Sequence, residues 1–183
     1  MFEQSANQQL MQKLTLYCMY IEHNDRWIPA VVLTEEYAVT AFHNIPDRFR
    51  ELGLSVTLCD AIGQHHEVHI HGVHSISNYV VFKRNTGNFV NVPDIVYPML
   101  LDQYIVMGFS FVDKTPSVKT GHISSMSTGR QQFFYGDAGR LSGSGGGVFY
   151  RRNGALIGIA KEMISAQVIY GHIEVRDYKP FSV

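Results

Sequence analysis

The sequence predicts an all-β protein preceded by a short helix, and three observations lead to this class. Short segments rich in β-branched and aromatic residues recur along the chain, among them TLYCMYIE, WIPAVVLT and QYIVMGFSF. Turn residues, as in HNDR and AIGQ, separate these segments. The segments number about twelve and fall into two sets of about six, which favours either paired antiparallel barrels or one large sandwich.

The segments divide the chain in order. Residues 1–14 are the expected helix, because Phe2, Leu10, Met11 and Leu14 can share one face and Ser5 is a candidate cap. Residues 15–85 hold the first set of strands, with a candidate helical turn in IPDRFRELG. The stretch NTGNFVNVPD is polar and holds Gly and Pro, so we expect a connection over residues 86–98. Residues 99–183 hold the second set.

Composition excludes several classes of function. Hydrophobic residues make up 45% of the 183, which indicates a folded core rather than disorder. The net charge of -1 argues against nucleic acid or an anionic membrane as partner. No apolar stretch approaches the ~20 residues that cross a bilayer. The start lacks a basic segment followed by an apolar one, so we expect a cytoplasmic protein, either made as such or released from a polyprotein, with Cys18 and Cys59 reduced.

Two short motifs carry chemistry. AVTAFHNI places His43 just after an apolar strand, and LSGSGGGVFY places Ser144 among glycines on a turn that leads into another strand. A serine nucleophile needs a base within hydrogen-bond reach and backbone N–H groups aimed at the developing oxyanion. Glycine costs conformational entropy wherever it is ordered, so such a run needs a cause. A tight turn that the substrate backbone approaches closely supplies that cause.

These motifs resemble those of the trypsin-like serine proteases. Thr40-Ala41-Phe42-His43 matches the family's TAxH, and Ser142 to Gly147 matches GxSGGP at three of five fixed positions. The segment FFYGDAGRLSGSGGGVFYRRNGALIGIA is similar to xxTDAxxxxGNSGGPLxxxxGxxxGI of the HtrA-like branch. Compact viral chymotrypsin-like proteases are similar too. The likeness extends from about Trp27 to about Lys161.

The resemblance implies two six-stranded antiparallel β-barrels packed face to face, with the active site between them and no cofactor or metal. It implies that Ser144 is the nucleophile, that His43 is the general base and acid, and that Asn78 holds the position of the third triad residue. The oxyanion hole would use the N–H groups of Ser144 and of Ser142 or Gly143. The walls of the substrate pocket would come from two segments, Ala138 and Arg140 on one side and Ile159, Ala160 and Lys161 on the other.

The sequence departs from the family pattern at the triad acid. The family has an aspartate where this chain has Asn78, and the same exchange in trypsin lowers turnover about 10⁴-fold. Asp60 and Asp94 are the other carboxylates considered, but neither lies at the matching position. Ser142 also replaces the glycine that supplies an oxyanion donor, and a non-glycine residue resists positive φ.

Two functions therefore stand as expectations from the resemblance. The first is a serine endopeptidase that cleaves a protein or polyprotein through an acyl-enzyme intermediate, with a small or medium apolar residue before the scissile bond. The alternative is a weak or inactive pseudo-protease that binds extended peptides in the cleft between the barrels.

The histidine-rich segment HHEVHIHGVH raises a third possibility, a metal-binding interaction domain. On a strand, His65, His69 and His71 face one side, and imidazoles are ligands for zinc or copper. Same-face neighbours on a strand are ~7 Å apart, which is wide for a shared ion. We therefore expect a solvated or half-buried hairpin and no bound metal.

Overall fold

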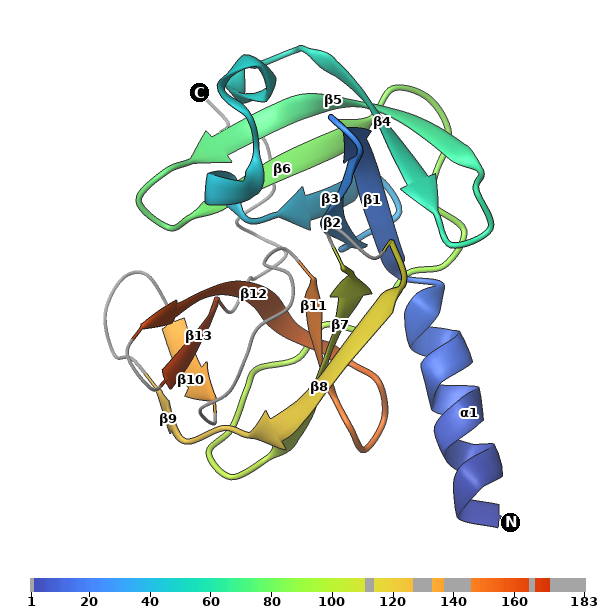
Figure 1. The fold of residues 1–183 in the computed structure, drawn as a ribbon, viewed down its shortest axis with the longest axis vertical. Helices are drawn as coiled ribbons and strands as arrows, with labels where there is room; N and C mark the ends of the chain where they lie inside the picture. Colours follow the sequence, from blue (N-terminus) through green and yellow to red (C-terminus); the bar gives the residue numbers. More distant parts are fainter. Residues whose placement is uncertain (1, 111–113, 127–132, 137–145, 165–166, 172–183) are drawn as a thin grey trace.

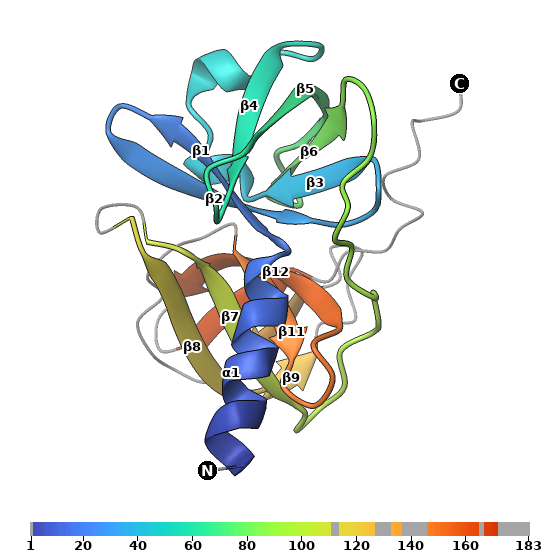
Figure 2. The ribbon, with the colours of Figure 1, turned by 90° about the vertical axis from the view of Figure 1, so that its right-hand side faces the viewer.

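The computed structural model describes residues 2–110, 114–126, 133–136, 146–164 and 167–171. It shows a β-barrel above, a second β-sheet below and one helix running beside the second sheet (Figure 1). Seen from the side, the helix lies against the part of the second sheet nearest the viewer (Figure 2). Among the described residues, none of the helices has the length and apolar character that crossing a bilayer requires.

The upper half is a closed antiparallel barrel. Its strands follow the order β1-β2-β3-β6-β5-β4, and Tyr20 pairs with Cys59 where the first strand closes on the fourth. Buried residues such as Ile28, Leu58 and Phe82 fill the interior. The elements are β1 (Cys18–His23), β2 (Arg26–Val32), β3 (Tyr37–Thr40), the 3-10 turns η1 (Phe42–Asn44) and η2 (Asp47–Arg50), β4 (Ser55–Asp60), β5 (His65–His74) and β6 (Tyr79–Arg84).

The lower half is a seven-stranded sheet in the order β8-β7-β11-β12-β13-β10-β9. Tyr104, Phe134 and Val148 are among the residues of its own buried cluster. The strands are β7 (Gln103–Phe109), β8 (Pro116–His122), β9 (Ser125–Met126), β10 (Phe133–Gly136), β11 (Gly147–Tyr150), β12 (Leu156–Ile164) and β13 (Gln167–Gly171).

The expected second six-stranded barrel is therefore corrected: the described part of this half forms a seven-stranded sheet that does not close. The chain bends at Ile123–Ser124, between β8 and β9. The N–H of Ile123 donates to the carbonyl of Asp102, whereas that of Ser124 donates to the carbonyl of Tyr135. The chain thus leaves β7 and joins β10, so β8 and β9 stand at opposite ends of the sheet although they are consecutive in sequence.

A third buried cluster joins the two halves. Val31, Val39 and Val81 of the barrel and Met107 and Phe149 of the sheet belong to this one cluster, so the two halves share a continuous apolar contact. Trp27 lies at the edge of this contact, stacked on Tyr20 at 3.8 Å and edge-on to Phe109 at 5.5 Å. Aromatic pairs in these arrangements stabilise a fold by more than their buried area alone accounts for.

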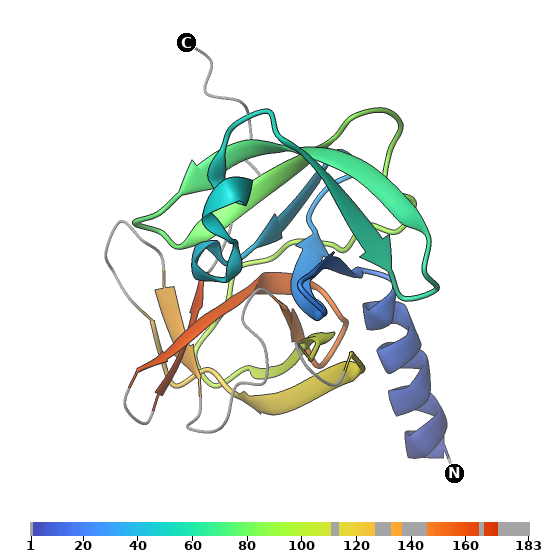
Figure 3. The same ribbon diagram turned by 45° about the horizontal axis from the view of Figure 1, so that its top comes forward.

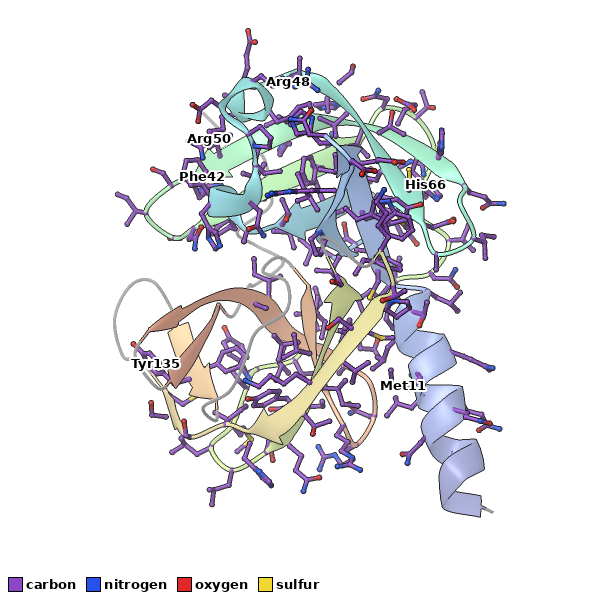
Figure 4. All side chains as sticks on the ribbon, viewed as in Figure 1. Met11, Phe42, Arg48, Arg50, His66 and Tyr135 are labelled. Atoms are coloured by element: carbon purple, nitrogen blue, oxygen red, sulfur yellow. The ribbon has the colours of Figure 1, made fainter. Side chains whose placement is uncertain are left out.

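Helix α1 (Phe2–Thr15) adds to the same cluster. Leu14 is fully buried, while Leu10 and Met11 are partly buried against the cluster, and Met11 points from the helix toward the sheet (Figure 4). The apolar face was expected. The expected cap at Ser5 was wrong, because the helix begins at Phe2 and Ser5 lies inside it.

Candidate active site

His43 lies just beyond β3, on a segment that is anchored at its start. Thr40, the last residue of β3, is fully buried, and its hydroxyl donates to the carbonyl of Pro29 in β2 (2.6 Å). Ala41 is also fully buried, and the chain then turns through η1, which contains His43. The Thr40 hydroxyl satisfies a buried carbonyl, and the small side chain of Ala41 fits the buried position that follows. His43 itself is exposed.

Asn78 holds this segment from the adjacent β5–β6 turn. Its φ is 60°, in the left-handed region that asparagine tolerates better than most residues. Its carbonyl accepts the N–H of Phe42 (3.2 Å), and its Oδ1 accepts the N–H of His43 (3.1 Å). The two backbone donors therefore fix the residue beside the histidine.

The same asparagine faces the imidazole. Nδ1 of His43 lies 3.1 Å from Oδ1 of Asn78 and 3.0 Å from its Nδ2. Because Oδ1 already accepts the N–H of His43, it faces the histidine and can also accept a hydrogen bond from Nδ1–H, which leaves Nε2 with its lone pair. An Nδ2 donor at Nδ1 selects the opposite tautomer, which has no lone pair at Nε2.

Gly146, two residues after Ser144 in sequence, packs where the two halves meet. A Cβ on Gly146 would lie 2.8 Å from the carbonyl oxygen of Met107, and one on Gly108 would lie 3.1 Å from Cα of Gly146 and 3.4 Å from Cβ of Pro29. The N–H of Ala160 donates to the carbonyl of Gly146 (2.9 Å). Only residues without a side chain allow this approach of backbones. The contacts lead from the start of β11 to Pro29, the partner of Thr40.

Comparison with known proteins identifies the fold and no more. No model of a known protein family matches the sequence, and no curated protein matches it. By structure, 1152 chains are similar. One is the serine endoprotease from Yersinia pestis, at 21% sequence identity and a TM-score of 0.71. The fold is that of a chymotrypsin-like serine protease. The match covers 90% of this chain and 61% of the endoprotease, so the chain spans less than two thirds of that relative.

The other expected site residues of this protease fold divide into two groups. Ile159 and Ala160 lie on β12 beside the start of β11, and both side chains are fully buried, one in the cluster between the halves and one inside the second sheet. Lys161 follows on the same strand. Outside the described residues lie Ser144, Ser142, Gly143, Ala138 and Arg140.

The carboxylates considered as stand-ins have other partners. Asp60 accepts the N–H groups of Ile62 and Gln64 and pairs with His66 at 3.0 Å. His66 lies at the opposite side of the barrel from Phe42, the residue before His43 (Figure 4). Asp94 belongs to the connection between the halves, where its carbonyl accepts the N–H of Leu156. Of these three residues, Asn78 contacts the imidazole of His43.

The histidine-rich strand β5 does not gather its imidazoles. His69 bonds to Asn85 (2.8 Å), its ring lies 6.3 Å from that of His71, and His66 lies between Asp60 and Arg84. Burial, followed by the charge of Lys83, lowers the pKa of His71. Within the described ranges, no group of three His, Cys, Asp or Glu side chains could hold a metal ion.

Sequence reasoning missed a hollow next to His43. Its volume is about 560 Å³, and it opens between the β1–β2 hairpin and the η1–η2 segment. In the sequence, the HNDR turn separates two strands, and its histidine and arginine are the visible signal for this hollow. The described residues that line the hollow are His23, Asn24, Arg26, Ile28, His43, Asn44 and Pro46.

Proposed function

We propose that this chain is a serine endopeptidase in which His43 of the barrel serves Ser144 of the second half. The observation that carries the proposal is the His43–Asn78 pair, in which an orienting oxygen lies 3.1 Å from the ring nitrogen that must bear the proton. Ser144 precedes Gly146 by two residues, so the chain allows a Cα separation of at most about 7 Å. Gly146 packs on Gly108, which is itself close to Pro29.

The reaction follows from these roles. Nε2 of His43 takes the proton of the Ser144 hydroxyl while Oγ attacks the peptide carbonyl. Backbone N–H groups near Ser144 stabilise the oxyanion, and His43 then gives its proton to the leaving amine as the C–N bond breaks. Water, deprotonated by the same imidazole, hydrolyses the acyl-enzyme. Throughout, the Nδ1–H of His43 donates to Oδ1 of Asn78.

Asn78 also sets the limit of this chemistry. Its amide orients the ring but has no negative charge to stabilise the imidazolium formed during attack. Exchange of asparagine for aspartate should therefore speed acylation by about 10³- to 10⁴-fold. The rate of labelling by a fluorophosphonate probe at neutral and alkaline pH measures this in the wild type, Asn78→Asp and Ser144→Ala.

We expect slow labelling of the wild type, fast labelling of Asn78→Asp and none of Ser144→Ala. Peptide cleavage should follow the same order. If neither the wild type nor Asn78→Asp reacts with the probe, and the variant has the melting temperature of the wild type, the endopeptidase proposal fails.

A pseudo-protease is the second candidate, and the contact of Asn78 Nδ2 with Nδ1 of His43 at 3.0 Å favours it. That donor holds the tautomer whose Nε2 cannot accept a proton. A descendant of this kind would bind extended peptides without cleaving them. It predicts peptide binding that is equal in the wild type and Ser144→Ala, with no covalent labelling of either.

A further inference from the structure

One wall of the hollow beside His43 is formed by the β1–β2 hairpin, which contributes His23 and Arg26. The β1–β2 hairpin turns through Asn24 and Asp25, whose φ values of 48° and 60° are those of a tight type I′ turn. His23 and Arg26 pair across the strands directly before and after this turn. The hairpin therefore holds both side chains beside the segment that carries His43.

The η1–η2 segment supports the hairpin from the other side. Arg48 lies 4.4 Å above the ring of Phe49 and donates to Nδ1 of His23 (3.2 Å), while His23 meets Phe49 edge-on at 5.2 Å. Because Nδ1 of His23 accepts this bond, its neutral ring carries the proton on Nε2. Figure 4 shows Arg48 and Phe42 on this segment, and Figure 3 shows the segment, in teal, above the orange and red strands of the second sheet.

Arg26 is left as the free cation of the hollow. The neighbouring Asp25 is bound by Lys114, and Asp47 is bound by Arg50 at 2.9 Å. Within the described part of the chain the guanidinium of Arg26 has no hydrogen-bond or ion-pair partner, and no acidic side chain lines the hollow. Buried Ile28 also lines the hollow and supplies an apolar surface.

The chemistry of the proposed reaction tells which half of a substrate meets this hollow. His43 hands its proton to the leaving amine, so the leaving half lies beside His43. The acyl half lies toward Ser144 and the start of β11, in the other half of the molecule. All described lining residues of the hollow belong to the barrel side.

We infer that Arg26 selects a substrate with an aspartate or glutamate on the leaving side of the scissile bond, whose carboxylate binds the guanidinium while its methylenes contact Ile28. The inference rests on the proposed endopeptidase function. Guanidinium binds a carboxylate through charge-assisted, bidentate hydrogen bonds that a neutral amide does not reproduce. In this proposal Arg26 binds a substrate side chain away from the scissile bond. It therefore determines which substrates are preferred and takes no part in the bond-breaking step.

Matched peptides test this preference. Cleavage sites found in a peptide library are resynthesised with Glu or Gln at each of the first three leaving-side positions, and kcat/KM is measured. At one position we expect Glu to exceed Gln about 10- to 100-fold in the wild type. Arg26→Gln should remove the difference, Arg26→Lys should retain part of it, and Arg26→Glu should favour Lys at that position. Arg152→Gln, a change at an exposed arginine on the β11–β12 turn, should leave it unchanged.

Failure of this inference is distinguishable from failure of the proposed function. Cleavage with equal kcat/KM for Glu and Gln, or with a preference that survives Arg26→Gln, overturns the role of Arg26 and leaves the endopeptidase standing. If no peptide of the library is cleaved, pairs of library peptides that differ only by Glu or Gln at one position are tested for binding to Ser144→Ala by calorimetry. Tighter binding of Glu peptides that Arg26→Gln abolishes supports the cationic pocket without the enzyme, and equal or absent binding overturns it.

Discussion

At the scale of single residues, Asn78 is the residue on which the proposed chemistry depends most. Its left-handed backbone, its carbonyl and its side-chain oxygen all serve the segment of Phe42 and His43. An aspartate accepts the same two hydrogen bonds and adds a charge, so Asn78→Asp changes the electrostatics with little change of shape. In the proposed mechanism, the neutral amide would orient the imidazole but would lack the charge that stabilises the imidazolium.

The cysteines give a prediction on reactivity. Burial raises the pKa of the Cys18 thiol to about 12, and its S–H donates to the carbonyl of Leu14 at 3.4 Å. At pH 8 the thiolate fraction of such a group is about 10⁻⁴, and the thiolate is the reactive form. Burial, followed by the charge of Glu22, also raises the pKa of Cys59.

Native protein should therefore resist iodoacetamide at pH 8 for hours, whereas protein unfolded in guanidinium should gain two adducts within minutes, as counted by intact mass. Because the barrier is a raised pKa and burial together, alkylation of Cys18 should increase as the pH rises toward 12. Rapid modification of Cys18 in the native protein at pH 8 would contradict its described environment.

At the scale of elements, the start of β11 depends on the absence of a side chain at Gly146. The methyl group of Gly146→Ala would lie 2.8 Å from a backbone oxygen of β7, which cannot move without shifting the sheet. We expect this change to lower the free energy of unfolding by about 1–3 kcal/mol and to reduce probe labelling.

Gly72→Ala is the matched control. Its methyl group would lie 3.1 Å from the imidazole end of His74, a side chain that can turn away. Thermal and urea unfolding should show a much smaller loss than for Gly146→Ala. An equal loss of stability in both variants would contradict the claim that the start of β11 requires glycine at position 146.

The elements also show what sequence could and could not predict. The barrel strands and the turn at η2 were predictable because alternating apolar residues and turn residues mark them locally. The bend at Ile123–Ser124 was not, because it depends on carbonyls of Asp102 and Tyr135 that are distant in sequence. The contact of His43 with Asn78 was predictable from their motifs, and the catalytic roles of both stay a prediction. The hollow beside His43 was not predictable, because it depends on how the hairpin of Arg26 meets the η1–η2 segment.

At the scale of the whole molecule, one apolar cluster unites helix, barrel and sheet. Leu14 is 0% exposed within it, whereas Leu16, two residues on, is 50% exposed. Residues of β2, β3, β7 and β11 all belong to this cluster. Its packing therefore fixes the position of the barrel, which carries His43, relative to β11 of the second sheet.

Leu14→Ala should lower the free energy of unfolding by about 2–5 kcal/mol through lost burial and the cavity left behind. Leu16→Ala should change it by no more than about 0.5 kcal/mol. Chemical unfolding followed by tryptophan fluorescence suits this comparison, because Trp27 lies at the edge of the same cluster. Equal effects of the two substitutions would contradict the docking of the helix.

The most direct test of the account is to trap the acyl group and find the atom that carries it. The protein is mixed with an activated peptide ester, quenched in acid, digested and mapped by mass spectrometry. If His43 activates Ser144 as proposed, the acyl adduct lies on Ser144 in the wild type. More of it forms in Asn78→Asp, and none forms in His43→Ala. An adduct on Ser142 instead, or one on Ser144 that forms equally fast without His43, would contradict the pairing of imidazole and hydroxyl across the two halves.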